Sequence, residues 1–360
     1  MESRQKSTSM LISGIGLGIK KIQWPLIALG VILVFNLFFT PGFFEISVQN
    51  GRLVGSLINM LKRAAPRLII ALGMTLVIGT KGIDISVGSI AAIAGATAVF
   101  VIRDGDITYL ATQGVSTVPI ILVIGIALLA AGICGLFNGL LVSTMKIQPI
   151  VATLILMVAG RGMAMLLTGG YVLNFEHPAY QALGIGNLFG IPTPIIIAAA
   201  MFLLISVITS RTPLGLFIQS TGGNATASRY SGTNIQMILM IVYIISGICA
   251  GVAGIIFTAD VQSADAAYIG LWIELEAILA VVIGGTSMNG GRYSLAGTVV
   301  GAMIIQALVT TLLTRAVPVQ YTLIFQAIVV IIVLILQTPR VKGLTFQSQR
   351  RRRAAEAENE

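Results

Sequence analysis

Charged residues are scarce in this chain. Only 10% of its 360 residues are Asp, Glu, Lys or Arg, whereas 56% are hydrophobic. Soluble domains carry about 25% charged residues, so folding as one soluble domain would leave long apolar runs facing water. The shortage of charge therefore argues against an ordinary soluble protein and favours burial in a lipid bilayer.

Cysteine and histidine are also nearly absent. Cys134 and Cys249 lie in apolar runs without CxxC spacing, and His177 is the only histidine. Metal sites need several such residues close together, so we expect no metal site. The chain also lacks a GxxxxGK[ST] phosphate loop, an HExxH motif and a GxSxG motif. We therefore predict no catalytic centre and no cofactor in this chain, and an intramembrane hydrolase has no support.

The formal charge of +9 does not indicate a nucleic-acid partner. A nucleic-acid binder concentrates Lys and Arg on a solvated domain, and the apolar runs leave no such domain. The basic tail Arg350 to Arg353 either contacts membrane lipid or is disordered.

Long apolar runs dominate what is present. Runs of about 18 residues or more can cross the roughly 30 Å hydrocarbon core as helices. They predict spans near 24–40, 66–82, 86–102, 118–142, 148–168, 192–209, 235–257, 271–286, 295–314 and 321–337. We therefore predict an all-α integral membrane protein with about ten transmembrane helices. Within the runs, Gly247/Gly251 and Gly297/Gly301 have the four-residue spacing that permits close helix packing.

An even number of spans puts both termini on one side of the membrane. Placing them in the cytoplasm assigns about 15 of the 22 Lys and Arg to that side, in agreement with the positive-inside rule. The predicted parts are a cytoplasmic N-terminal segment 1–23, a transmembrane domain 24–339 with a cytoplasmic loop 211–234, and a cytoplasmic tail 340–360.

Four basic residues do not fit this topology, because they fall at the outer end of the second span. They are Arg52, Lys62, Arg63 and Arg67. Either residues 50–62 form an amphipathic segment in the membrane interface, with their apolar side chains facing lipid, or the first loop is assigned to the wrong side.

Two stretches of the chain resemble one another. VIGTKGIDISVGSIAAIAGA begins at Val77 and VIGGTSMNGGRYSLAGTVVGA begins at Val282. Many transporters contain internal repeats with interrupted helices. Chance similarity between two glycine-rich segments is the alternative.

The loop RTPLGLFIQSTGGNATASRYSGTN, residues 211–234, is unlike the other loops. Gly222, Gly223 and Asn224 are expected to form a turn, and Ala225 to Tyr230 a short helix. A short helix in this position is either a docking element for a partner or an ordinary amphipathic connector.

Several of these segments resemble the permease subunits of the ribose, arabinose and galactofuranose ABC importers. TPLG followed by GGNATASRYSG is similar to their cytoplasmic coupling segment. GMTLVIGTKGIDISVGS, from Gly73, is similar to their GMTxVIxxGGIDLSVGS signature, with Lys81 in place of a glycine. KIQPIVATLILMVAGRG and GLWIELEAILAVVIGGTSMNGG are most similar to the galactofuranose-type permease.

The resemblance implies a permease of the bacterial inner membrane that imports a monosaccharide by ATP-driven alternating access. It implies a cytoplasmic ATPase subunit that binds ATP and Mg, a second permease subunit, homologous or identical, and a periplasmic or lipid-anchored sugar-binding protein. It places the ATPase contacts at Gly215, Gly222, Asn224, Ala227, Arg229, Ser231 and Gly232. Thr226 stands where relatives often have an acidic residue.

Four polar residues are our candidates for shaping the sugar path: Asp84, Ser86, Glu274 and Glu276. A carboxylate buried in the membrane costs about 2.5–3.5 kcal/mol, so Asp84 needs a reason to lie between two apolar runs. It either serves the path or caps the next helix beside Ser86 at a turn. The glutamates, with Asp260 and Asp265, form either an outer vestibule or a solvated loop.

The alternative function is an ion-coupled secondary transporter of a small polar solute. Such a transporter needs ionisable residues within the membrane as ion sites, and Asp84 would be the main candidate.

Overall fold

The computed structural model describes residues 23–49, 51–105 and 118–315, with single positions between 318 and 331. The first helix is Gln23–Phe39. The others are α2 (Ser56–Gly79), α3 (Val87–Ile102), α4 (Ile120–Ser143), α5 (Pro149–Leu167), α6 (Pro178–Ile185), α7 (Thr193–Arg211), α8 (Leu214–Gly223), α9 (Ala225–Tyr230), α10 (Ile235–Val261), α11 (Ile273–Ile283) and α12 (Leu295–Thr314).

The described residues also contain three short antiparallel strand pairs. They are β1 (Ser47–Gln49) with β2 (Arg52–Val54), β3 (Leu173–Asn174) with β6 (Ser263–Ala264), and β4 (Asn187–Leu188) with β5 (Ile191–Pro192). The expectation of an all-α chain is therefore correct for the long apolar runs and wrong for these connections.

The nine predicted spans within the described ranges are all occupied by helices. Five of these helices, α4, α5, α7, α10 and α12, are long and apolar enough to cross a membrane. The main difference is α2, which begins at Ser56 instead of residue 66. The predicted tenth span, 321–337, lies mostly outside the described residues, as do segment 1–22 and the tail 340–360.

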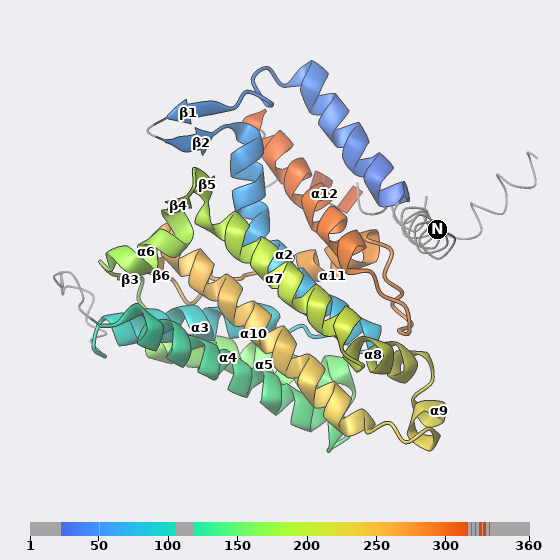
Figure 1. The fold of residues 1–360 in the computed structure, drawn as a ribbon. Helices are drawn as coiled ribbons and strands as arrows, with labels where there is room; N and C mark the ends of the chain where they lie inside the picture. The colour runs from blue at the N-terminus through green and yellow to red at the C-terminus, as the bar shows by residue number, and fades with distance from the viewer. Residues whose placement is uncertain are drawn as a thin grey trace, which may run out of the picture.

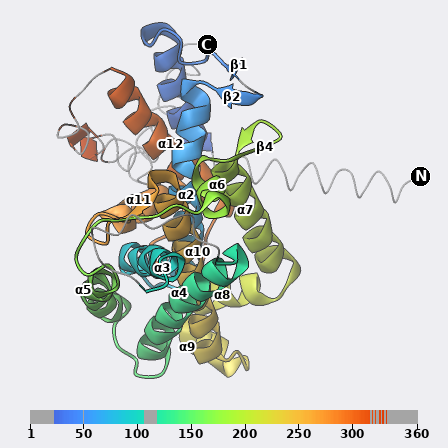
Figure 2. The same ribbon diagram turned by 90° about the vertical axis from the view of Figure 1, so that its left-hand side faces the viewer.

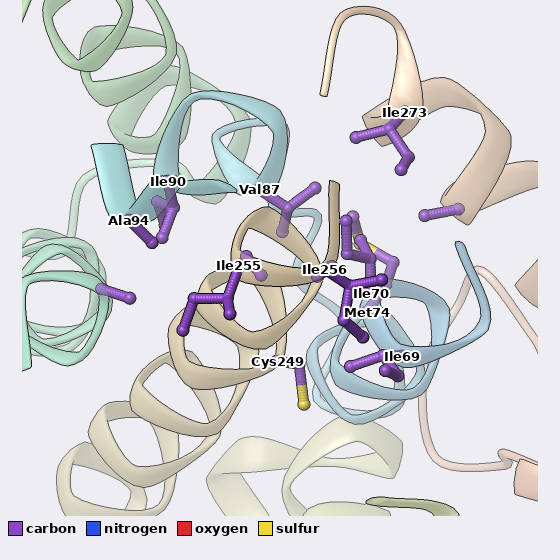
Figure 3. Close-up of a cluster of buried hydrophobic side chains, with 14 of the residues drawn as sticks. Ile69, Ile70, Met74, Val87, Ile90, Ala94, Cys249, Ile255, Ile256 and Ile273 are labelled. Atoms are coloured by element: carbon purple, nitrogen blue, oxygen red, sulfur yellow. The ribbon is translucent and has the colours of Figure 1, made fainter. Parts of the chain in front are cut away.

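Helix α10 is the centre of the bundle and packs against α2, α3 and α4 (Figure 1). Figure 3 shows isoleucines of α2, α3 and α10 gathered in this core. Glycines permit the close approach: a Cβ on Gly247 would lie 2.6 Å from the Ala131 carbonyl oxygen, and one on Gly301 would lie 2.0 Å from that of Ala280. Close packing at both predicted glycine pairs is thus confirmed, since Gly251 and Gly297 are equally confined.

The bundle has two distinct ends. The β1–β2 and β4–β5 hairpins lie at one end, which we call the hairpin end, and α8 and α9 lie at the other, the α9 end (Figures 1 and 2). The two hairpins are joined, because the Leu53 N–H donates to the Gly190 carbonyl at 3.0 Å.

The predicted interfacial segment 50–62 is wrong. Arg52–Val54 of this segment form strand β2, which pairs with β1, and the residues from Ser56 begin α2. Met60 is only 1% exposed and packs with Phe43 and Ala307, so it does not face lipid. Hydrophobic periodicity alone does not reveal that another part of the same chain covers this helix face.

Two helices that occupy predicted spans, α3 and α11, are too short to cross the membrane. At 1.5 Å per residue, the 16 residues of α3 and the 11 residues of α11 extend about 24 and 16 Å, against a hydrocarbon core of about 30 Å. Each of the two helices is preceded by a non-helical segment, residues 80–86 before α3 and residues 262–272 before α11. The second segment packs against the start of α3, since a Cβ on Gly88 would lie 2.5 Å from the Gly270 carbonyl oxygen.

The two stretches of similar sequence adopt similar local structures, each a helix, a turn and a second helix. In the first, Lys81 has φ 70° and the Gly82 N–H bonds the Val77 carbonyl. In the second, Gly285 has φ 87° and the Thr286 N–H bonds the Val281 carbonyl. These are Schellman turns, in which glycine is preferred at the left-handed residue. Lys81 therefore occupies a position that favours the glycine usual in the similar permeases.

Candidate functional site

Asp84 is the centre of a buried hydrogen-bond network. Its Oδ1 accepts from the Ser86 N–H at 3.1 Å and the Ser86 hydroxyl at 2.6 Å, and its Oδ2 accepts from the Ser246 hydroxyl at 2.9 Å. The Asn138 amide donates to Ser86 Oγ at 2.7 Å. Asp84, Ser86 and Asn138 are completely buried. The network thus fastens the non-helical segment 80–86 to α4 and α10.

Asp84 and Ser86 therefore lie together, but inside the packed bundle. The side chain of Ser86 makes no capping bond at the start of α3, and Asp84 is not at an exposed turn. Non-helical backbone at membrane depth must be buried in protein or line a water-filled cavity. Here it is buried, and the carboxylate helps to satisfy it.

Glu276 does not join the Asp84 network and forms an ion pair with Arg67, in the middle of α2. The Arg67 Nε lies 2.5 Å from Glu276 Oε2, and the Lys62 Nζ lies 2.6 Å from Asp260 Oδ1. These pairs join α2 to α11 and to α10. Two of the four basic residues that did not fit the predicted topology thus have acidic partners.

Glu274 is 5% exposed and packs against Gly88, at the start of α3. Arg161 lies close by, and its Nη1 donates to the Ala266 carbonyl at 2.9 Å and the Ile269 carbonyl at 2.6 Å. Arg161 therefore holds the segment before α11 in place, while Glu274, in α11, packs against the start of α3.

A cavity of about 360 Å³ lies between α2, α10, α11 and the segment before α11. Its polar lining residues are Arg67, Ser263, Asp265, Tyr268 and Glu276. Of the four path candidates, only Glu276 reaches this cavity.

The loop 211–234 consists of α8, α9 and their connections. The predicted short helix Ala225–Tyr230 is confirmed as α9, and the Asn224 side chain caps it by accepting from the Ala227 N–H at 3.0 Å. Gly222 and Gly223, expected in a turn, instead form the last residues of α8.

Gly222 lies at the junction of three segments. A Cβ there would lie 1.9 Å from the Gly79 carbonyl oxygen and 2.6 Å from the Gly291 nitrogen. The Gly291 N–H donates to that same Gly79 carbonyl at 3.0 Å. We call these three residues the glycine junction. It joins α8 to the end of α2 and to the turn between α11 and α12.

Tyr293 packs beside the glycine junction, close to the positions that side chains on Gly79 and Gly215 would occupy. Burial raises the pKa of the Tyr293 phenol, so it remains neutral at physiological pH.

The coupling candidates divide into two groups. Gly215 and Gly222 are buried against the chain's own backbone, whereas Asn224, Ala227, Arg229, Ser231 and Gly232 are exposed on and around α9. Tyr230 is 89% exposed.

Sequence reasoning missed four residues that the structure joins to the candidates: Arg67, Asn138, Ser246 and Tyr293. Asn138 and Ser246 are isolated polar residues inside apolar helices. Such residues usually face the bundle interior, which is a signal that could have found them.

Comparison with known proteins identifies the class. A family model described as the permease component of the branched-chain amino acid transport system matches residues 56–334. This chain belongs to that permease family. With its apolar helices, it is a multi-pass protein of the bacterial inner membrane.

Three relatives make the similarity more specific. The galactofuranose transporter permease protein YtfT of Escherichia coli (strain K12) is 46% identical over 331 residues, covering 90% of this chain and 93% of the relative. The fructose import permease protein FruF of Bifidobacterium longum is 39% identical, covering 92% and 91%. The ribose import permease protein RbsC of Escherichia coli (strain K12) is 36% identical, covering 88% and 94%. The resemblance to sugar permeases is confirmed. No solved structure gives a significant match.

The Asp84 network generates a stability prediction. Asp84→Ala leaves the Ser86 and Ser246 hydroxyls without their acceptor, and a buried unsatisfied group costs about 1–3 kcal/mol. We expect a clearly lower melting temperature in detergent, measured by thermal denaturation. Asp84→Asn is the control, because its amide oxygen can still accept both bonds from Ser86 and its NH2 group can donate to the Ser246 hydroxyl, so it should cost less than Asp84→Ala. Equal stability of Asp84→Ala and the wild type would contradict the role given to this network.

Proposed function

We propose that this chain is the permease subunit of an ATP-driven bacterial monosaccharide importer, with galactofuranose as one candidate sugar. The observation that carries the proposal is the glycine junction, which connects the exposed helix α9 to both helix–turn–helix stretches. Force applied to α9 by a partner would reach the non-helical segments through closely packed backbone. An ion-coupled transporter has no need of such an element, and the sugar permeases among the relatives favour the importer.

The proposed topology has ten spans and both termini in the cytoplasm, with the α9 end facing the cytoplasm and the hairpin end facing outward. Residues 1–23 and 340–360 are then cytoplasmic, and 24–339 form the transmembrane permease domain. Lys62 and Arg67 then lie on the outward side as an exception to the positive-inside rule, and each is paired there with an acidic residue.

The proposed coupling surface is formed by the exposed residues Asn224, Ala227, Arg229, Ser231 and Gly232. They contact a cytoplasmic ATPase that binds ATP and Mg. Gly215 and Gly222 do not contact the ATPase. They let α8 pack closely against the rest of the permease. A second permease, homologous or identical, completes the membrane part, and an outer sugar-binding protein delivers the substrate.

The proposed sugar path runs past Glu276 and Glu274 and then past the segment held by Asp84 and Ser86. ATP binding by the ATPase moves α9, and the glycine junction transmits this motion to the two non-helical segments. Their displacement opens or closes the sugar path. Asp84 and Ser86 shape the path by fixing segment 80–86, and no bond chemistry takes place in this chain.

The first test is affinity purification of the chain from its native membrane in mild detergent, with identification of co-purifying subunits. We expect an ATPase, and we expect Arg229→Glu to reduce its recovery at least ten-fold by reversing an exposed charge on α9. Arg211→Glu, the same change at the end of α7, is the matched control and should retain the ATPase. Recovery of the chain alone, with uptake driven by an ion gradient in liposomes, would contradict the importer.

The glycine junction generates a second test. Gly222→Ala places a methyl group where the Gly79 carbonyl lies, so α8 must move away. Gly223→Ala is the matched control, since its added Cβ would have no atom within 4 Å. We expect Gly222→Ala to reduce ATP-dependent sugar uptake in proteoliposomes at least ten-fold while the ATPase still binds, and Gly223→Ala to transport normally. Normal uptake by Gly222→Ala would show that the junction does not transmit motion.

A further inference from the structure

The cavity beside α11 lies where the helical structure is interrupted. The segment 262–272 before α11 is not helical, and residues Ser263 to Leu271 of that segment contribute much of the cavity wall. Its volume of about 360 Å³ is within the range of small-molecule sites, about 300–1,000 Å³. Substrate sites of transporters are commonly built at such interrupted helices.

The lining carries hydrogen-bonding groups of both kinds. Arg67 uses Nε for Glu276 and Nη1 for the Arg63 carbonyl, and a guanidinium has five N–H donors, so donors remain. Asp265 uses Oδ1 to accept from the Ala267 N–H at 3.1 Å, and a carboxylate can accept about four hydrogen bonds. Tyr268, 72% exposed, adds a hydroxyl that donates and accepts.

The charges around the cavity are close to balanced. Arg67 is paired with Glu276, and Arg161 interacts electrostatically with Glu274 and Asp265. A cavity without a large excess of either sign suits a neutral solute with many hydroxyls better than an ion. The apolar part of the lining, including Phe257, suits the C–H face of a sugar ring.

Arg161 and Gly88, which do not line the cavity, hold its wall in place. Arg161 bonds two carbonyls of this segment, and a Cβ on Gly270, which has φ 65°, would lie 2.8 Å from the Gly88 carbonyl oxygen. The shape is therefore present before a ligand arrives, which lowers the cost of binding. The contact with Gly88 also connects the cavity to α3, and so to the segment fastened by Asp84.

From these observations we propose that the cavity is a transient binding site for the hydroxyl groups of a monosaccharide in transit. Arg67, Asp265 and Tyr268 bind the sugar together with Glu276. The assignment rests on the proposed import function and extends it to a specific site. Binding here is weak, because the Arg67–Glu276 pair competes with the sugar for the same groups, and weak binding favours rapid release.

The first experiment measures sugar imported per ATP hydrolysed by the complex purified with this chain, in proteoliposomes, with D-galactose, D-fructose and D-ribose in turn. We expect Asp265→Asn to lower this ratio about ten-fold, as for loss of a hydrogen bond to a charged group, and Tyr268→Phe to lower it about five-fold, as for loss of a neutral hydrogen bond, while ATP hydrolysis continues. Asp260→Asn is the matched control, since Asp260 pairs with Lys62 and does not line the cavity. An unchanged ratio in Asp265→Asn, or an equal loss in Asp260→Asn, would overturn the site.

The second experiment tests occupancy directly. Leu271→Cys puts a thiol in the cavity wall, and Leu188→Cys puts one on the β4–β5 hairpin, at similar exposure of 43% and 50%. The native Cys134 and Cys249 are buried, so background labelling by a maleimide is low. We expect the imported sugar, at millimolar concentration, to slow labelling of Leu271→Cys at least three-fold and to leave Leu188→Cys unchanged. Equal labelling with and without sugar would overturn the site, whereas absence of ATP-driven uptake in the wild-type complex would overturn the import function itself.

Discussion

The Gly79 carbonyl accepts a hydrogen bond from the Gly291 N–H at 3.0 Å, and Gly222 packs against both groups. Transmission of motion from α9 into the bundle depends on this contact. Three backbones meet without side chains between them, so a displacement of one cannot be absorbed by rotamer changes in the others. Because packed interiors are dense and shift between discrete arrangements, the junction can carry motion from an exposed helix into the bundle.

The second constraint is the need to satisfy backbone groups that are not helical at membrane depth. Segment 80–86 meets it with Asp84, whose carboxylate is bonded to Ser86 and Ser246, and segment 262–272 meets it with Arg161. Charged side chains in the membrane are expensive, and here they are used where the backbone has left the helix. Gly270 of the second segment contacts Gly88 of α3, the helix that directly follows the first segment. A shift of either segment can therefore displace the other and change the cavity between α2, α10 and α11.

Local sequence signals predicted much of this structure. Apolar runs located the helices, and the expected turn at Gly222 to Asn224 led to the prediction of a short helix at Ala225–Tyr230, which is α9. The partners of Asp84 were not predictable in this way, because Asn138 and Ser246 lie on separate helices far along the chain and meet only through tertiary packing. The start of α11 was placed near residue 271 instead of Ile273, since an apolar residue such as Trp272 looks the same whether its φ is helical or, as here, 64°. The ion pairs of Lys62 and Arg67 were missed for the same reason as the network: opposite charges in sequence do not reveal which of them meet.

Joint movement of α9, the glycine junction and the turn between α11 and α12 is tested most directly by two spin-label distances in the complete complex, measured with and without a non-hydrolysable ATP analogue. One pair joins Thr226→Cys on α9 to Met288→Cys in the turn between α11 and α12, and the other joins Thr226→Cys to Ile150→Cys at the start of α5. If α9, the junction and that turn move as one body, ATP leaves the first distance unchanged and alters the second. A change in the first distance as large as that in the second would contradict the account.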